Sequence, residues 1–276
     1  MDTEKNRFNK LQQEQRDLDE SYQQSKRNKK ERENLSNYKF NKLYDYPRSM
    51  RTLVGGKRHY DIREEKLPSV TTILSACQSP EKKASLAAWK AKMGNEAADK
   101  VRDTAAERGT AMHKYLEHHI DGTGLKDLTP LGVQAETMAN KIIESGLKDL
   151  EEVWGQEVTL YYPGLYAGAT DVVGIFDGQP AIIDFKQSNK PKRREWIEDY
   201  FEQLGAYCMA HNYVYGTKIQ SGIILMCTKD FMFQKFEVSG SEFVRYQHAF
   251  LKKADQYHQN CTQEKKGQDT KNDQKV

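Results

Sequence analysis

A tight turn near the middle of the chain constrains its fold more than any other feature. Asp177 and Gly178 stand between two runs of alternating apolar residues, a pattern that favours a β-hairpin with a two-residue turn. Counting outward from this turn pairs Asp171 on the first strand with Asp184 on the second. Their Cβ atoms should then lie about 5 Å apart on one face. Two like charges so close repel each other, so the sequence predicts a positive charge between them.

Two positive partners fit this pair of acids. Lys186 lies two residues after Asp184 and leaves the same face of the same strand. A divalent cation is the other candidate, because Asp171, Asp184 and an intervening backbone carbonyl are hard oxygen ligands suited to Mg²⁺ or Mn²⁺. A solvated Lys–Asp surface pair is the structural alternative. The flanking residues are apolar on both faces, which indicates buried strands and favours a metal site.

The pattern of the surrounding residues predicts a mixed α/β (α+β) fold, with a central β-sheet flanked by helices. A serine cap and a proline at Ser79-Pro80 begin a helix, and two more helices are expected over 103–120 and 131–149. The periodicity then changes to that of strands. Strands are expected at 157–162, 168–176 and 180–187, a helix at 194–211, strands at 221–228 and 232–238, and a last helix to about 258.

Composition divides the chain into three parts. Residues 1–50 form a charged N-terminal extension that we expect to be partly disordered or helical, because it has few large apolar residues to bury. Residues 51–260 should form the folded domain. Residues 261–276 are expected to be a disordered polar tail.

Charge and cysteine content exclude several classes of protein. Lys, Arg, Asp and Glu make up 30% of the chain, but the net charge is +3, so binding to nucleic acid would need a local basic patch. No apolar run approaches the ~20 residues of a membrane-spanning helix, so no membrane partner is expected. The four cysteines form no C-x-x-C pair, and the N-terminus has no targeting pattern, so we expect a cytoplasmic protein with reduced thiols.

Four motifs in order resemble the PD-(D/E)xK nuclease superfamily, and in particular its RecB-like branch. Asp171 followed by Asp184-Phe185-Lys186 resembles the superfamily signature. The helical segment around His113 (109–117) resembles the histidine motif of the branch, and Gln203 with Tyr207 resembles its Q-x-x-x-Y motif. With residues 67–74 and Trp89, the sequence is similar to the mitochondrial genome maintenance exonucleases and phage exonucleases. The resemblance covers about residues 57–250.

This resemblance implies a restriction-endonuclease-like core with an N-terminal helical arch over residues 80–120. It also implies that a catalytic Mg²⁺ or Mn²⁺ is held by His113, Asp171, Asp184 and the carbonyl of Phe185. Lys186 would orient and activate the attacking water and stabilise charge on the phosphate. From the residues alone, His113 is ambiguous, since a single histidine on a helix is more often structural.

Other candidate residues carry open alternatives. Gln203 and Tyr207 share a helix face, and the motif implies that they support Lys186 and contact the nucleic acid. The cluster of Lys190, Lys192 and Arg193 either binds phosphates or is a solvated loop. Glu157 on the first strand either approaches the metal or is a plain exposed glutamate, and it is not counted as a ligand.

The resemblance implies a metal-dependent DNA exonuclease that prefers single-stranded DNA and acts in phage DNA recombination, replication or degradation, with phage recombination or replication proteins as partners in the host cytoplasm. The alternatives are a structure-specific endonuclease of the same superfamily and a non-catalytic DNA-binding recombination partner. No iron–sulfur cluster is expected, because the C-terminal region offers Cys261 alone, and no ATP, because a G-x-x-x-x-G-K-[ST] loop is missing.

Overall fold

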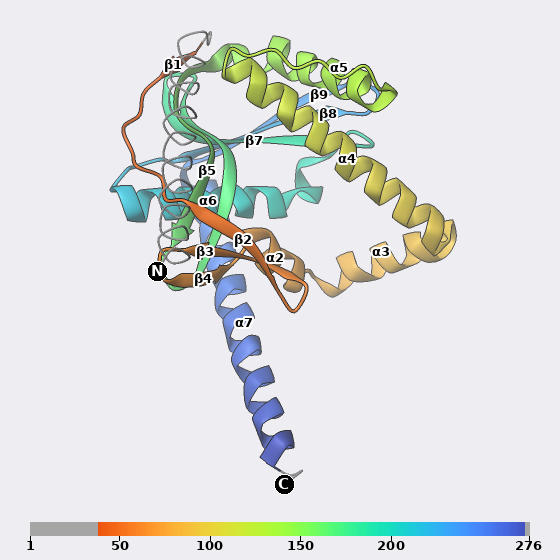
Figure 1. The fold of residues 1–276 in the computed structure, drawn as a ribbon, viewed down its shortest axis with the longest axis vertical. Coiled ribbons are helices and arrows are strands. Elements are labelled where there is room, and N and C mark those ends of the chain that lie inside the picture. Colours follow the sequence, from red (N-terminus) through yellow and green to blue (C-terminus); the bar gives the residue numbers. More distant parts are fainter. Residues whose placement is uncertain (1–37, 274–276) are drawn as a thin grey trace, which may run out of the picture.

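The computed structural model describes residues 38–273, with the backbone alone for 264–273. Most of the expected N-terminal extension, residues 1–37, therefore lies outside the described residues. The described chain forms one large mixed sheet, a small antiparallel sheet and a set of helices around them (Figure 1). This arrangement confirms the predicted α+β fold with a mixed central sheet.

The large sheet has six strands in the order β1-β5-β6-β7-β8-β9. Pairing is antiparallel from β5 through β7 and between β8 and β9, whereas β1–β5 and β7–β8 are parallel. The central strands alternate between two buried faces, which explains their nearly continuous apolar sequence. The strands are β1 (Lys39–Phe40), β5 (Leu150–Tyr162), β6 (Tyr166–Phe176), β7 (Gln179–Ser188), β8 (Ser221–Thr228) and β9 (Phe233–Ser239).

Helices cover both faces of this sheet (Figure 1). On one face α4 (Asn95–Ile120) and α5 (Pro130–Ser145) bury Met112, Leu116 and Ile142. On the other face α2 (Val70–Ala76), α6 (Glu198–Tyr215) and α7 (Gly240–Asp273) bury Phe201 and Phe250, among others. The sheet thus separates two hydrophobic cores. None of the helices in the described residues is long and apolar enough to cross a membrane.

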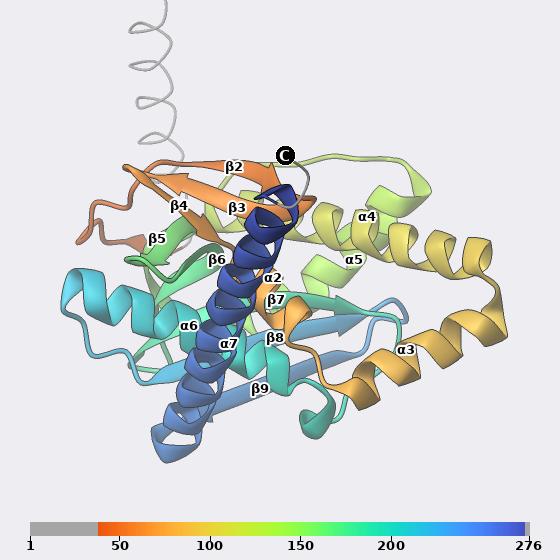
Figure 2. The same ribbon diagram turned by 90° about the horizontal axis from the view of Figure 1, so that it is seen from below.

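The small sheet lies across one end of the large one (Figure 2). Its strands are β2 (Ser49–Val54), β3 (Lys57–Ile62) and β4 (Glu65–Pro68), all antiparallel. Tyr60, Ile62 and Leu67 pack on Tyr161 of β5 and Ala167 of β6. The β2–β3 hairpin is therefore attached to the part of β6 that leads to Asp171.

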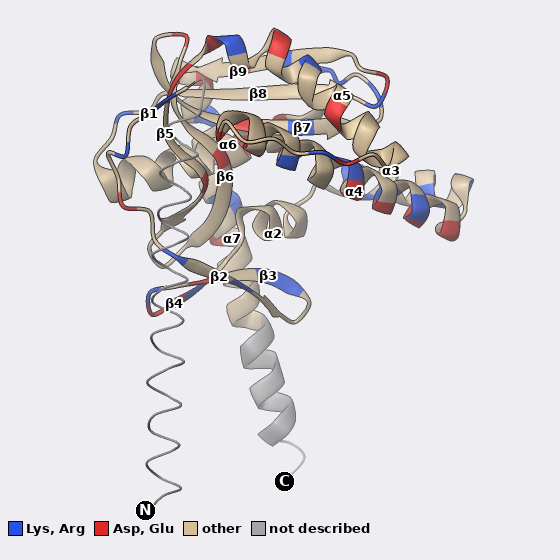
Figure 3. Cartoon of the chain, turned by 45° about the horizontal axis from the view of Figure 1, so that its top comes forward, with Lys and Arg blue, Asp and Glu red and all other residues tan. Residues whose placement is uncertain are grey.

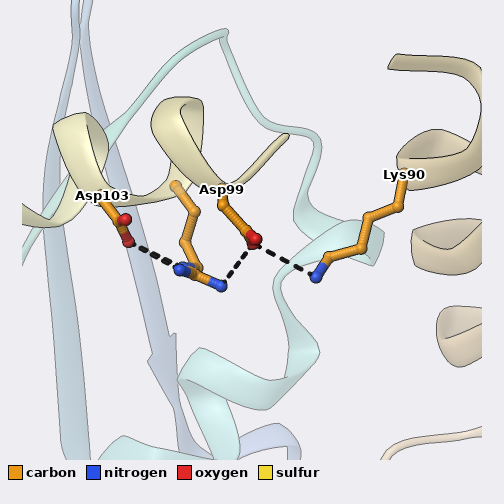
Figure 4. Close-up of polar contacts among 4 residues, drawn as sticks. Lys90, Asp99 and Asp103 are labelled. Carbon is orange, nitrogen blue, oxygen red and sulfur yellow. Dashed lines mark hydrogen bonds and ion pairs between the residues drawn. The ribbon is translucent and has the colours of Figure 1, made fainter. Parts of the chain in front are cut away.

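Helix α3 and the first part of α4 project together from one side of the body (Figure 1). Ser79 caps α3 (Pro80–Met93) by accepting the Lys82 N–H, as the Ser-Pro start predicts. No residue of α3 is buried, and it is linked to α4 through polar contacts (Figure 4). Asp99 on α4 pairs with Lys90 (3.5 Å) and with Arg102 (2.8 Å).

Several boundaries differ from those expected from sequence. The helix expected over 103–120 begins earlier, at Asn95. Its first turns are mostly exposed and carry no apolar periodicity, so the sequence pattern does not reveal them. The helix expected over 131–149 ends at Ser145 and is followed by a short 3₁₀ helix (Leu147–Asp149), so β5 begins at Leu150. A second 3₁₀ helix (Arg194–Trp196) precedes α6, and the last helix continues to Asp273, through part of the expected polar tail.

Candidate active site

The candidate site lies where strands β6 and β7 part. The turn at Asp177 and Gly178 has left-handed backbone angles (φ 48° and 70°), which suit a two-residue hairpin, and the register follows the prediction up to the pair Val172–Ile183. The next residues outward are Asp171 and Asp184. Beyond them β6 continues beside β5, and β7 beside β8 (Figure 1). The two acids therefore stand at the mouth of a gap in the sheet.

Asp171 is held by two contacts from opposite directions. Its Oδ1 lies 3.2 Å from His113 Nδ1 on α4, and its Oδ2 accepts the backbone N–H of Phe185 on β7 at 2.5 Å. The side chain thus occupies the place where a ladder hydrogen bond between β6 and β7 would otherwise form. With 9% of its surface exposed, Asp171 is nearly buried, and its carboxylate is fixed in orientation.

Glu157 on β5 completes a compact group of ligand atoms. His113, Glu157 and Asp171 each offer one N or O atom, and these atoms all lie within 4.8 Å of one another. The β5–β6 register pairs Gln156 with Val172 and Val158 with Thr170, which places Glu157 across from Asp171. Glu157 itself has a left-handed backbone (φ 50°) and an exposed side chain.

Asp184 is paired with Lys186, one of the two positive partners that the sequence offers. The Lys186 Nζ forms an ion pair with Asp184 Oδ2 and also lies 5.1 Å from the centre of the Tyr200 ring. The other oxygen, Asp184 Oδ1, accepts from Gln203 Nε2 at 3.3 Å, and Gln203 Nε2 also donates to the Tyr207 hydroxyl at 3.2 Å. Gln203 thus contacts Asp184 rather than Lys186, and Gln203 and Tyr207 are both buried.

The pKa values of these groups reflect competition between burial and charge. Burial alone would lower the pKa of His113, but the charge of Asp171 and the hydrogen bond to it raise this pKa to about 9. Burial raises the pKa of Asp184, and the charge of Lys186 opposes this only in part. Glu157 reaches solvent, yet the protein around it and the charge of Asp171 raise its pKa to about 7. The site thus contains three carboxyl groups, Asp171, Asp184 and Glu157, but only two groups that can be positively charged, His113 and Lys186.

Helix α4 reaches this site because its residues fit closely against the end of β7. A Cβ on Gly109 would lie 3.1 Å from Gln187 Cγ, so glycine lets the helix approach the strand. Arg108 is buried, and its guanidinium donates to Gln187 Oε1 (2.9 Å) and to Asn189 Oδ1. These contacts set the height of α4 and place His113 one turn further along, above Asp171.

The basic cluster after β7, Lys190, Lys192 and Arg193, contains both exposed and partly buried side chains. Lys190 and Arg193 are exposed, and the guanidinium of Arg193 lies 5.3 Å from the centre of the Trp196 ring. Lys192 is partly buried, and its backbone exchanges two hydrogen bonds with Gln234. A phosphate-binding role for Lys190, Lys192 and Arg193 stays a prediction, as does the contact of Gln203 and Tyr207 with nucleic acid.

The donor set fits a divalent cation. One imidazole and two carboxylates converge within 4.8 Å. Asp184, expected as a ligand from the sequence, is not part of this group, although the charge of Asp171 acts on it. Carboxylate oxygens with a single histidine suit Mg²⁺ or Mn²⁺ better than a soft metal, which would favour thiolates. The four cysteines are free thiols and none belongs to this group. A cation would also offset the charge of Asp171, which adds to the effect of burial in raising the pKa of Glu157.

Comparison with known proteins identifies the relatives of the chain. It is 27% identical to mouse mitochondrial genome maintenance exonuclease 1 over 194 residues, which are 63% of this chain and 56% of that protein. The human protein of the same name is 27% identical over 187 residues, 61% of this chain and 51% of that protein. The chain resembles these exonucleases. It spans about half the length of the curated relatives it matches.

No family model matches the chain. Among solved structures, a Eubacterium rectale protein named as an exonuclease is 16% identical and overlaps 53% of this chain and 63% of its own with a TM-score of 0.39. An alkaline exonuclease from Laribacter hongkongensis is 14% identical, with a TM-score of 0.26 over 57% of this chain and 84% of its own. The expected resemblance to mitochondrial genome maintenance exonucleases is thus confirmed by the sequence relatives.

Glu157 is the residue whose role the sequence left open, between approaching the metal and an ordinary exposed position on the strand. The signal was present, because Pro163 and Gly164 mark a second turn, and Tyr162 pairs with Tyr166 across it. Counting outward from that turn places Glu157 across from Asp171. The same counting that paired Asp171 with Asp184 therefore brings a third acid to the group.

Proposed function

We propose that this protein is a metal-dependent deoxyribonuclease of the PD-(D/E)xK type that acts as an exonuclease and prefers single-stranded DNA. The observation that carries the proposal is the convergence of His113, Glu157 and Asp171 beside the Asp184–Lys186 pair. The similarity to mitochondrial genome maintenance exonucleases supports the same chemistry. The role in phage DNA metabolism, with phage proteins as partners in the host cytoplasm, remains a proposal from the sequence.

In this proposal the residues divide the work by position. His113, Asp171, Asp184 and the newly located Glu157 would hold Mg²⁺ or Mn²⁺, and the carbonyl of Phe185 is a further proposed ligand. When bound, such a metal lowers the pKa of a coordinated water and polarises a phosphoryl oxygen. Lys186 keeps its proton, because the charge of Asp184 raises its pKa despite burial, and so supplies a fixed positive charge near the scissile phosphate.

Gln203 has a positioning role in this proposal. Its side-chain amide donates to Asp184 and to the Tyr207 hydroxyl, so it fixes the Asp184 carboxylate from the side opposite Lys186. A carboxylate held in this way presents one orientation to an ion, which reduces the entropy that binding would otherwise cost.

A nuclease assay with end-labelled linear and circular single-stranded DNA tests the activity. With Mg²⁺ or Mn²⁺ the wild-type protein should degrade the linear DNA and leave the circular DNA intact, and EDTA should stop the reaction. Lys186→Ala should lower the rate by about a hundredfold or more, because a charge at the site of developing negative charge is lost. Lys148→Ala, an exposed lysine of the 3₁₀ helix before β5, is the matched control and should keep full activity.

Other outcomes decide between the alternatives. Cutting of circular DNA would instead identify an endonuclease. Binding of DNA without any metal-dependent cleavage would identify a non-catalytic protein. A Lys186→Ala protein as active as the wild type would show that Lys186 is not catalytic. Calorimetric titration with Mn²⁺ in the absence of DNA tests the site separately: Glu157→Gln should weaken binding about tenfold or more, and Glu151→Gln on the same strand should not.

A further inference from the structure

The β2–β3 hairpin is fixed at two points beside the candidate site. Ser49 Oγ on β2 lies 2.7 Å from Thr159 Oγ1 on β5. Near the other end of the hairpin, the carbonyl of Arg58 accepts hydrogen bonds from the Ser69 N–H and the Thr72 hydroxyl, both at 3.0 Å. Ser69 also caps α2 and forms a bridge to Ala167 of β6. The hairpin is therefore held in a defined place over β5 and β6.

Arg51 extends from the face of this hairpin that looks toward the site. Residues two apart on a strand share a face, so Ser49 and Arg51 lie on one side of β2, and Glu157 and Thr159 on one side of β5. A single step along each strand leads from the Ser49–Thr159 contact to Arg51 and Glu157. Because Tyr60, the cross-strand partner of Arg51, packs against Tyr161 of β5, this face of the hairpin is turned toward β5.

The guanidinium of Arg51 is positioned by a contact with an aromatic ring and is not paired with a carboxylate in the described residues. It lies 5.8 Å from the centre of the ring of Tyr60, its cross-strand partner, which is itself buried. In the described part of the chain it forms no ion pair with a carboxylate, unlike Arg102, which pairs with Asp99, and Arg194, which pairs with Glu242. The segment from Arg51 to Arg58 carries three cations and no acid, and basic residues colour the end of the hairpin in Figure 3.

We propose that the β2–β3 hairpin is a nucleic-acid contact surface on which Arg51 binds a backbone phosphate of the strand in the active site. A planar guanidinium with several donors suits a phosphate, and a ring below it reduces the conformational freedom lost on binding. The phosphate would be a neighbour of the one at the metal site, because the Ser49–Thr159 contact sets Arg51 on the hairpin one step away from Glu157 on β5. This inference rests on the proposed nuclease function and adds the element that positions its substrate.

The hairpin also carries an exposed apolar side chain beside Arg51. Leu53 lies beside Arg51 on the same face, opposite Arg58, and 74% of its surface is exposed. A hydrophobic side chain between two arginines suits a base attached to the bound phosphate. The hairpin end therefore offers both charge and apolar surface to one strand, which fits single-stranded better than fully paired DNA.

Salt-dependent binding tests the role of Arg51 directly. The affinity for a fluorescein-labelled oligo(dT) is measured by anisotropy in EDTA, where metal-dependent cleavage stops, over a series of salt concentrations. Arg51→Gln should bind about tenfold more weakly, because a charge-assisted contact is lost. The slope of log affinity against log salt should fall by about 0.7, as expected when one phosphate contact of a single strand is removed. Arg51→Lys should keep the wild-type slope.

Arg63→Gln is the matched control. Arg63 lies in the turn between β3 and β4 and is also over a tyrosine ring, 5.7 Å from the centre of Tyr161. It follows Ile62, the partner of Ser49, and so lies on the side of the Ser49–Thr159 contact away from Arg51. It should keep both the affinity and the slope of the wild type. An unchanged slope for Arg51→Gln, or an equal loss for Arg63→Gln, would overturn the proposal.

The nuclease function and the role of the hairpin predict different results for the wild type and for Arg51→Gln. If the wild-type protein neither binds nor degrades DNA, the proposed function is wrong and the role of Arg51 falls with it. If the wild type degrades DNA while Arg51→Gln binds it like the wild type, the nuclease function stands and the role of the hairpin is wrong.

Discussion

At the scale of single residues, His211 on α6 is a buried histidine outside the candidate site. None of its surface is exposed, its Nε2 lies 3.0 Å from the Tyr46 hydroxyl, and its Nδ1 lies 2.8 Å from Thr217 Oγ1. The rings of Tyr44 and Tyr215 stand with their centres 4.8 Å from its own. Burial lowers the pKa of His211 to about 4. The folded protein therefore keeps this imidazole neutral at pH values where a free imidazole is charged.

This pKa predicts acid-sensitive stability. Between about pH 6.5 and about pH 4 the unfolded chain binds a proton that the folded chain does not, so stability falls as the pH falls through this range and loses nothing more below it. From about pH 7 to about pH 5 the loss should be about 2 kcal/mol. Urea unfolding at the two pH values should show that His211→Gln removes this part of the loss. The exposed His248→Gln should not, and equal losses in both variants would contradict the assignment.

Residue positions were predictable from sequence where a turn fixed the count. Asp171, Asp184 and Lys186 could be grouped because Asp177-Gly178 sets the register of one hairpin. Glu157 was left open because its place depends on a second turn, at Pro163 and Gly164, which the count from Asp177-Gly178 does not include. The burial of Arg108 could not be predicted either, since its partners Gln187 and Asn189 come from a strand end distant in sequence.

At the scale of elements, the contact of α6 with β6 depends on Gly168. A Cβ at this position would lie 2.7 Å from Tyr207 Cε1 and 2.9 Å from its hydroxyl oxygen. Tyr207 has little room to yield, because it is buried and hydrogen-bonded to Gln203. Glycine thus allows the helix that carries Gln203 to approach the strand that carries Asp171.

Gly168→Ala should therefore destabilise the protein by about 1–3 kcal/mol, the usual cost of adding a methyl group where no space exists. The midpoint of urea unfolding measures the change. Gly124→Ala is the control, since a Cβ there would meet nothing within 4 Å and the backbone is not left-handed. Equal midpoints for Gly168→Ala and the wild type would show that the helix moves aside at no cost.

Element boundaries were harder to predict than element types. The serine caps of α2 and α3 mark their starts, and the hairpin turn marks β6 and β7. The start of α4 carries no such signal: Gly94 precedes it without a side-chain cap, and its first three turns bury Ala98 alone among residues 95–105. A helix stabilised by polar residues on all sides has no apolar stripe for periodicity to detect.

At the scale of the whole molecule, stability should be uneven. Helix α6 buries ten of its residues, from Phe201 to His211, whereas α3 buries none and is joined to α4 by exposed ion pairs. Exposed ion pairs contribute little stability. The projecting helix should therefore open locally without unfolding of the sheet.

Hydrogen–deuterium exchange followed by mass spectrometry tests this difference. Amides of α3 (Pro80–Met93) should exchange orders of magnitude faster than those of α6 (Glu198–Tyr215) under native conditions. Strand β7, in the middle of the sheet, provides an internal standard of slow exchange. Equal protection of α3 and α6 would mean that α3 unfolds only with the rest of the chain.

The sequence predicts that nucleic-acid binding needs a local basic patch, but it does not predict which cations form that patch. A net charge of +3 requires a local basic patch for nucleic acid, and the sequence offers cations along residues 90–108 and 190–194. In the structure Lys90 and Arg102 pair with Asp99, and Arg108 is buried. Arg51, outside both clusters, is exposed on the hairpin that contacts β5 through Ser49 and Thr159. Only the fold determines which cations remain available.

The hydrogen bond from the Phe185 amide to Asp171 has a consequence for chemical substitution. In an Asp171→Asn variant, the side-chain carbonyl oxygen must face the Phe185 amide, because an N–H cannot face another N–H. Its NH₂ group then points at His113 and Glu157, with two hydrogens in the direction from which a cation would be bound. Asp171→Asn would thus place hydrogen-bond donors where the wild type has a negatively charged oxygen, so it would repel a cation instead of binding it less tightly.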